Sequence, residues 1–162
     1  RAAADMLATV WEFEFPATCA VLAAVKNDSR HYKPDAKSRT AWDLATHLAT
    51  TDIWFIDCIV NGKFEWDPEK VKQAEAQFTS VDDIVAFYKK TFPEKMNALR
   101  ALPGDRLTSS IDCFGNFNWP AVRYIGFANN HSIHHPGQLA AYLRAMGSKV
   151  PSIYGPSADA KD

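Results

Sequence analysis

Hydrophobic residues recur at helical spacing along most of the chain. In residues 3–25, apolar side chains return every three or four positions, which predicts one amphipathic helix. Pro16 falls inside it and is expected to kink it, because proline removes a backbone donor and crowds the preceding turn. The predicted buried stripe consists of Met6, Leu7, Val10, Phe13, Ala17, Val21 and Ala24.

Two further helices are delimited by their end signals. Thr40 followed by Asp43 has the spacing of a capping box, and Gly62 supplies a stop about twenty residues later. Ser80 and Asp83 repeat the capping-box spacing at the start of a third helix. The buried stripe of the second helix is predicted to contain Leu44, His47, Leu48, Thr51, Phe55 and Ile59. That of the third contains Val81, Ile84, Val85, Tyr88, Phe92, Met96 and Leu99.

A fourth helix is predicted from Pro120 to about Met146. Proline suits the first turn of a helix, and the segment is apolar on most sides, as in a central, buried helix. Polar connections are expected at residues 27–39 and 64–79, and a small hairpin or an irregular crossover at residues 107–118. The pattern therefore predicts an all-α four-helix bundle, with residues 1–162 forming a single domain.

Composition and charge narrow the function classes. The net charge is −1 and the basic residues are scattered, so neither a nucleic-acid nor a membrane partner is expected. No uninterrupted run approaches the roughly 18 apolar residues of a membrane span, and no apolar signal core is visible. The three cysteines, Cys19, Cys58 and Cys113, are far apart and odd in number, which favours a reducing, cytoplasmic location over a disulfide framework.

Three histidines form the candidate chemical site. His131 and His135 are four residues apart on the predicted fourth helix, so both can reach one cation, whereas His134 points about 100° away. His47 lies on the inward stripe of the second helix. Taken alone, His47 fits a hydrogen-bonded core residue and the helical pair fits a chance surface pattern. Their combination inside one bundle favours a metal site with His47, His131 and His135 as its three ligands.

The ligand type indicates which metal and which chemistry to expect. Three neutral imidazoles suit one divalent ion of zinc, nickel or iron(II), and they leave a coordination position open for water or substrate. A zinc peptidase would have a glutamate beside the first histidine of the pair, where this chain has Ser132. Gln138, one turn beyond His135, is a candidate partner of that ligand or an amide that pairs with a neighbouring helix.

Three segments resemble the DinB-like (damage-inducible) family in order and spacing. They read AWDLATHLA at residues 41–49, NNHSIHHPGQLAAYLRAMG at residues 129–147 and KVPSIYGPSAD at residues 149–159. The resemblance implies a four-helix bundle with long crossover connections, a metal held by His47, His131 and His135, and dimerisation. This chain departs from the family pattern at Pro136, which removes a backbone bond to Ser132 and is expected to tilt the helix beyond the site.

Relatives with assigned activities in the wider superfamily are thiol-dependent transferases and a mycothiol-dependent maleylpyruvate isomerase. The resemblance therefore implies a metal-dependent thiol S-transferase that uses a low-molecular-weight thiol and a small-molecule substrate. A metal-dependent hydrolase and a non-catalytic, metal-stabilised stress or binding protein are the alternatives. A homodimer is expected, because Trp11, Phe15 and Trp54 are apolar residues beyond a single buried stripe.

Overall fold

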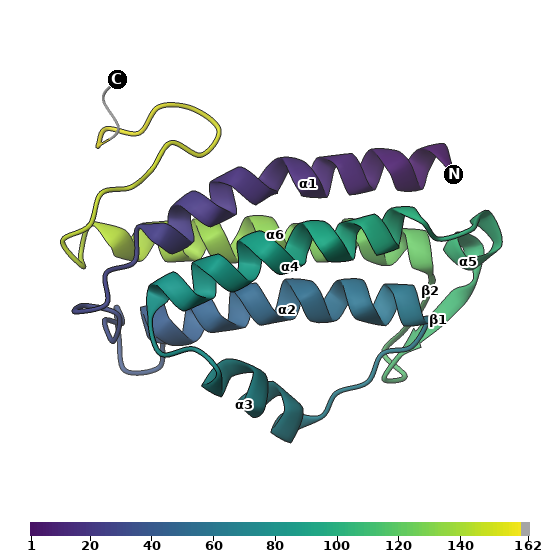
Figure 1. The fold of residues 1–162 in the computed structure, drawn as a ribbon, viewed down its shortest axis with the longest axis horizontal. Coiled ribbons are helices and arrows are strands. Elements are labelled where there is room, and N and C mark those ends of the chain that lie inside the picture. Colours follow the sequence, from purple (N-terminus) through teal and green to yellow (C-terminus); the bar gives the residue numbers. More distant parts are fainter. Residues whose placement is uncertain (160–162) are drawn as a thin grey trace.

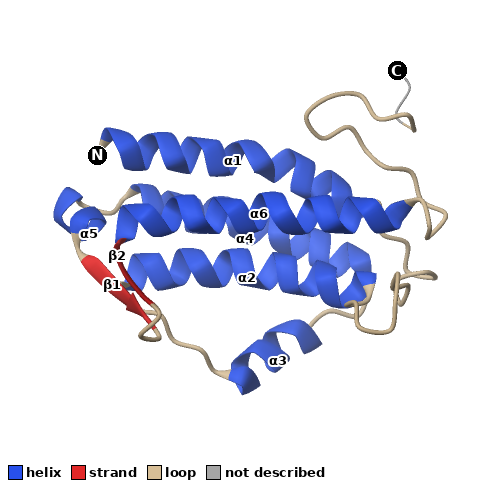
Figure 2. Cartoon of the chain, turned by 180° about the vertical axis from the view of Figure 1, so that it is seen from behind, coloured by secondary structure: helices blue, strands red, loops and turns tan. Residues whose placement is uncertain are grey.

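Four long helices form a bundle in the computed structural model, which describes residues 1–159 (Figure 1). This confirms the predicted all-α architecture. The helices are α1 (Ala2–Ala23), α2 (Ala41–Asn61), α4 (Val81–Arg100) and α6 (Ala121–Leu143). Both α1 and α2 pack against α4 and α6, so that α1 and α2 occupy opposite corners, and α6 lies between them when seen from behind (Figure 2).

The second and third long helices run in the same direction, which requires a long crossover between them. Residues 62–80 return along the outside of the bundle from the end of α2 to the start of α4 (Figure 1). This connection contains α3 (Pro68–Ala76), where the sequence analysis expected no helix. Asp67 starts α3 by accepting from the backbone N–H groups of Glu69 and Lys70, with Pro68 at its first position.

The predicted helix ends are confirmed at both capping boxes. The Thr40 side chain accepts from the Asp43 backbone N–H, and the Asp43 carboxylate accepts from the Thr40 backbone N–H. Ser80 and Asp83 make the same reciprocal pair at the start of α4. These bonds satisfy donors that a helix start leaves open, and the box before α2 fixes the first turn of the helix that carries His47.

A small hairpin closes one end of the bundle, which settles the alternatives left open for residues 107–118. After the short helix α5 (Gly104–Thr108), strand β1 (Ser110–Cys113) pairs antiparallel with β2 (Phe117–Pro120). The Tyr124 hydroxyl of α6 donates to the Ile111 carbonyl at 2.9 Å and fastens the hairpin to the bundle. Helix α6 begins directly after Pro120, as the sequence predicts, and runs through Pro136 without ending.

The predicted inward face of α1 is wrong for Met6, Val10 and Phe13, although Val21 of the same stripe is buried and Leu7 and Ala24 pack against the core. Met6 and Phe13 are each 70% exposed, whereas Trp11 is completely buried and donates from its indole Nε1 to Ser132 Oγ on α6 at 2.6 Å. Because α1 carries apolar residues around most of its circumference, periodicity alone admits two stripes. The small residues Ala4 and Ala8, which lie on the Trp11 face, allow α1 to approach its neighbours closely, and this contact selects that face.

Helix α1 bears on the expectation that no segment resembles a membrane span. Among the described helices, it alone has the length and apolar composition of a membrane span, a criterion that core helices and signal sequences also meet. Asp5, Glu12 and Glu14 interrupt its apolar residues, so the helix contains no long uninterrupted apolar run. In the fold, part of this apolar surface packs in the bundle core through residues such as Trp11 and Leu22.

Candidate metal centre

The three histidines singled out from the sequence come together between α2 and α6. His47 Nε2 and His131 Nε2 lie 3.3 Å apart, and one ligand atom from each of His47, His131 and His135 falls within 4.8 Å of the others. All three side chains are half-buried, so the cluster lies at the edge of the core with access from solvent. His134 is exposed and does not belong to the group, as its helical phase predicts.

Each imidazole is held from its other nitrogen. His131 Nδ1 lies 2.8 Å from Asp52 Oδ1, His47 Nδ1 lies 3.0 Å from Thr51 Oγ1, and His135 Nδ1 lies 3.1 Å from Gln138 Oε1. A carboxylate and an amide oxygen only accept hydrogen bonds, so His131 and His135 carry their proton on Nδ1 and present an Nε2 lone pair. Gln138 thus contacts His135 on its own helix.

Asp52 and Thr51 are site residues that the sequence analysis did not identify. Asp52 is completely buried, and its second oxygen, Oδ2, accepts from the Tyr88 hydroxyl of α4 at 2.8 Å. The signal was an aspartate within the apolar stretch of α2, five positions after His47, since an ionised side chain is seldom buried without a partner. The partners could not be read from the sequence, because they come from α4 and α6.

The electrostatic environment keeps two of the imidazoles neutral. Burial, the Arg39 charge and the two neighbouring histidines lower the pKa of His47 to about 3. Burial and the charge of His131 are the main causes that lower the pKa of His135 to about 4. A neutral imidazole is the form that binds a metal, so these two side chains need not lose a proton to act as ligands at neutral pH.

The geometry fits a divalent metal of the kind that imidazoles prefer. Two nitrogens bound to one tetrahedral ion at 2.0–2.1 Å lie about 3.3–3.4 Å apart, which matches the observed His47–His131 separation. The three ligand atoms together lie within 4.8 Å of one another and would draw closer around an ion. Each ring is also supported through its second nitrogen, as metal-bound histidines usually are. His47, His131 and His135 would therefore hold the ion.

Neither Tyr154 nor His31 belongs to this cluster. Tyr154 donates from its hydroxyl to Glu14 on α1 at 2.6 Å and does not cover the histidines. His31 is an exposed loop residue. Pro136 is buried within a continuous α6, and the histidine pair before it keeps its helical spacing.

Comparison with known proteins identifies the family. The DinB family model matches residues 3–161, nearly the whole chain. The chain belongs to the DinB family. Its relatives include the uncharacterised protein YjoA of Bacillus subtilis, which is 31% identical over 133 residues, covering 80% of this chain and 82% of that protein.

Solved structures of DinB-like proteins share the fold. A DinB-like protein from Bacillus cereus superposes with a TM-score of 0.74 at 26% identity, covering 91% of this chain and 95% of that one. YfiT of Bacillus subtilis, described as a probable metal-dependent hydrolase with an unusual four-helix bundle topology, gives a TM-score of 0.69 at 14% identity, covering 89% and 87%. The mycothiol-dependent maleylpyruvate isomerase gives 0.68 at 14% identity, covering 84% of this chain and 60% of that one. The likeness to the last two proteins is one of fold alone.

Proposed function

We propose that this DinB-family protein is a metal-dependent enzyme that transfers an electrophilic group to a low-molecular-weight thiol. The observation that carries the proposal is the convergence of three imidazoles, each supported through Nδ1, at a partly exposed position. Three protein ligands at an accessible position are typical of catalytic rather than structural metal sites. Zinc, nickel and iron(II) are the ions that this donor set suits.

When bound, a divalent metal would act as a Lewis acid that lowers the pKa of a thiol or a water molecule beside it. The protein's own residues perform the positioning. Asp52 and Gln138 hold the rings of His131 and His135 in the orientation in which Nε2 faces the centre. Phe55, whose ring lies 5.5 Å from that of His131, provides an apolar wall that keeps bulk water from this side.

The nucleophile is proposed to come from solution, because the chain's cysteines are poorly suited to the task. Burial raises the pKa of Cys19 and of Cys58 to about 11 and also raises that of Cys113. A thiol with a raised pKa has little of the reactive thiolate at neutral pH. In the proposed reaction, the sulfur of the small thiol bonds to the electrophile, the leaving group departs with its electron pair, and the thiol proton passes to solvent.

A metal-dependent hydrolase is the alternative, and the likeness to YfiT favours it. Such a reaction commonly uses a carboxylate as general base. In the part of the chain that the structure describes, the carboxylate that contacts the cluster is Asp52, and both of its oxygens are already bonded. This arrangement favours a nucleophile that the metal alone can activate, such as a thiol. A blocked metal site would favour a non-catalytic, metal-stabilised role, and the three histidines are instead partly exposed.

The test compares consumption of 1-chloro-2,4-dinitrobenzene by metal-loaded protein with and without glutathione, bacillithiol or mycothiol. His47→Ala serves as the variant and His134→Ala as the matched control. We expect acceleration that needs both thiol and metal, is lost in His47→Ala and persists in His134→Ala. Thiol-independent, metal-dependent hydrolysis of 4-nitrophenyl acetate would instead support the hydrolase. Absence of both activities in protein that binds metal would support the binding role.

A further inference from the structure

A second feature of the molecule is a cavity between the bundle and the crossover helix α3. It measures about 220 Å³. Its largest apolar walls are Trp54 of α2, Val71 of α3, Phe87 of α4 and Trp66, which precedes α3, and the charged residues Asp57 and Lys70 also line it. Trp66 is 49% exposed and stands edge-on to Trp54, with ring centroids 5.5 Å apart. A large aromatic side chain left half-exposed at the rim of an apolar cavity is a common feature of ligand sites.

The cavity adjoins the histidine cluster along one face of α2. Thr50 and Thr51, which line its near end, are three and four residues beyond His47, and Trp54 is seven residues beyond it. Residues at these spacings share a helix face, so the cavity starts about one turn, or 5.4 Å along the axis, from His47. Thr51 joins the two sites directly, because its hydroxyl contacts His47 Nδ1 at 3.0 Å.

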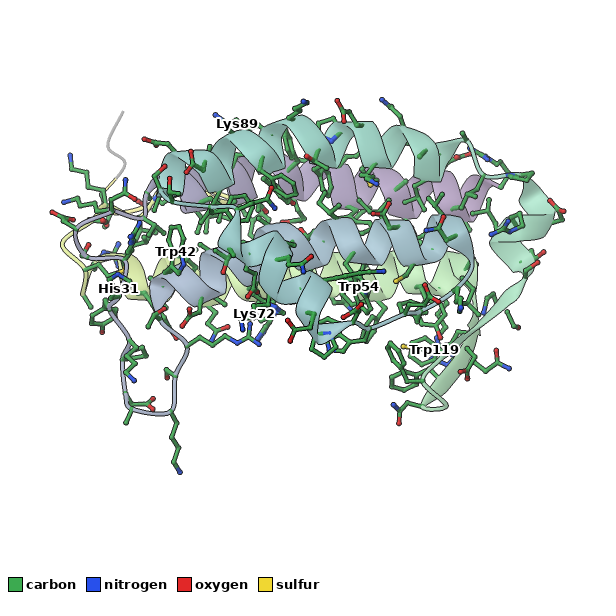
Figure 3. All side chains as sticks on the ribbon, turned by 60° about the horizontal axis from the view of Figure 1, so that its bottom comes forward. His31, Trp42, Trp54, Lys72, Lys89 and Trp119 are labelled. Atoms are coloured by element: carbon green, nitrogen blue, oxygen red, sulfur yellow. The ribbon has the colours of Figure 1, made fainter. Side chains whose placement is uncertain are left out.

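The helix that covers the cavity is weakly packed. Helix α3 has nine residues and none of them is buried, so it lacks the apolar burial that normally stabilises so short a helix. The flanking segments are anchored instead, by Phe64 before α3 and Phe78 after it, each 6% exposed. Trp54 lies next to α3 (Figure 3), and its indole Nε1 donates to the Glu65 carbonyl at 2.8 Å, which fixes one wall. The crossover is thus tied at its ends, and at its centre α3 contacts α2 without burying any of its own residues.

From these observations we propose that the cavity under α3 binds an aromatic group of the substrate and directs its reactive end towards the histidine cluster. The cavity volume is large enough for one ring or two fused rings, since an apolar cavity of about 150 Å³ accommodates benzene. The assignment of this group to the substrate rests on the proposed function. The inference that the cavity binds an aromatic molecule depends only on the residues that line it, and it is tested separately.

The far end of the cavity indicates which substituents such a molecule can carry. Past Trp54 the space continues into a larger and more polar region, which is lined by Lys63, Glu65 and Asp67 and shares Lys70 with the cavity. Asp57 at the junction is paired with Lys95 of α4 at 2.6 Å. Cations and carboxylates alternate there, so the region suits a polar, uncharged or zwitterionic tail rather than a strongly charged one. The ligand class is therefore an aromatic body with a polar substituent pointing to solvent.

The first experiment measures binding of 2-naphthol to metal-free protein by isothermal titration calorimetry. Ala74→Trp places an indole on the cavity side of α3, and Ala76→Trp places the same group on its exposed side. We expect wild type and Ala76→Trp to bind equally, and Ala74→Trp to bind at least about tenfold more weakly, the effect of overfilling a packed space. Equal affinities in all three proteins, or no binding to wild type at millimolar concentration, would overturn the proposal.

A second measurement places the ligand relative to the histidines and needs no stable variant. Wild-type protein is loaded with cobalt(II) or zinc, and the proton linewidths of 2-naphthol are followed in both samples. We expect broadening with paramagnetic cobalt(II) and not with zinc, because the cavity begins one helical turn from His47. Binding of both metals and of 2-naphthol without selective broadening would refute the link between the two sites. Failure of cobalt(II) to bind would instead refute the metal centre and leave the calorimetric result standing.

Discussion

At the scale of single residues, the candidate centre depends on a small number of polar side chains set into apolar helices. The imidazoles of His47, His131 and His135 supply the convergent nitrogens, and Thr51, Asp52 and Gln138 orient them. The two groups act differently. The histidines would bind the ion themselves, whereas the others act through the rings that they hold.

Replacing His131 or His135 with alanine should abolish metal binding, whereas His134→Ala should retain it. Each of the first two changes removes one of three nitrogens in the cluster, while His134 is exposed and lies outside it. We expect the affinity for zinc or nickel, measured by competition with a chromogenic chelator, to fall by more than about 100-fold in the ligand variants, beyond the effect of losing an outer partner. Equal losses in all three variants would refute the ligand assignment.

Asp52→Asn should weaken metal binding about 10- to 100-fold, the usual effect of changing the partner that orients a metal-bound histidine. The matched control is Tyr88→Phe, which removes the other hydrogen bond to Asp52 and leaves the bond to His131 in place. The same chelator competition measures both variants, and urea unfolding checks that each is folded. The positioning role would be wrong if Asp52→Asn bound metal as tightly as Tyr88→Phe.

The metal-free protein should lose stability as the pH falls below the ordinary histidine pKa of 6.5. The pKa of His47 is lowered to about 3 and that of His135 to about 4 in the folded protein. Between pH 6.5 and about 4 the unfolded chain therefore binds protons that the folded chain does not, and protonation favours unfolding. Urea unfolding in EDTA at pH 7 and pH 5 should show this decrease. The His47→Gln/His135→Gln double variant should show a smaller one.

At the scale of secondary-structure elements, end signals position the ligands along the bundle. The capping box at Thr40 sets the start of α2, and Gly62, with φ of 72°, ends it. The hairpin and α5 connect α4 to α6 at the end of the bundle where α2 also ends. This connection fixes where His131 lies along α6. Helix α3 is the exception, because it contributes no buried residue and is held through the segments on either side.

Two glycine substitutions should shift stability in opposite directions. Gly62→Ala places a Cβ in left-handed backbone and 2.7 Å from the Arg106 guanidinium, so it should lower the free energy of unfolding by about 1–2 kcal/mol. Gly137 lies within α6 with open space around it, and Gly137→Ala should raise that free energy by about 0.5–1 kcal/mol. Chemical denaturation measures both. A stabilising Gly62→Ala would show that the helix end does not require this conformation.

At the scale of the whole molecule, the bundle brings distant parts of the sequence into one site and leaves an apolar surface on α1. Residues 47 and 131 are 84 positions apart in the chain, yet their Nε2 atoms are within contact distance. The orientation of α1 leaves Met6, Val10 and Phe13 on the outside, exposed by 70%, 39% and 70%. A contiguous apolar surface of this kind commonly marks an association site.

A homodimer remains our prediction, now with a different surface from the one the sequence suggested. Trp11 is completely buried within the chain, so the expected contact surface consists of Met6, Val10 and Phe13. Light scattering at high protein concentration should give twice the chain mass of 18.1 kDa. Phe13→Glu should shift the protein towards monomer, and Phe114→Glu on the hairpin turn should not. A wild-type monomer at every concentration would refute the prediction.

The sequence by itself determined the four long helices, two of their capping boxes and the three histidines, because these depend on local spacing and backbone chemistry. A capping box requires residues three positions apart, and the histidine pair requires one helical turn. Only the tertiary structure decided the inward face of α1, the partners of Asp52 and the cavity beneath α3. These three features depend on which surfaces of different helices meet. A helix that is apolar on several sides does not by itself specify which side faces its neighbour. The site therefore combines ligands set by helical period with orienting bonds and walls set by packing.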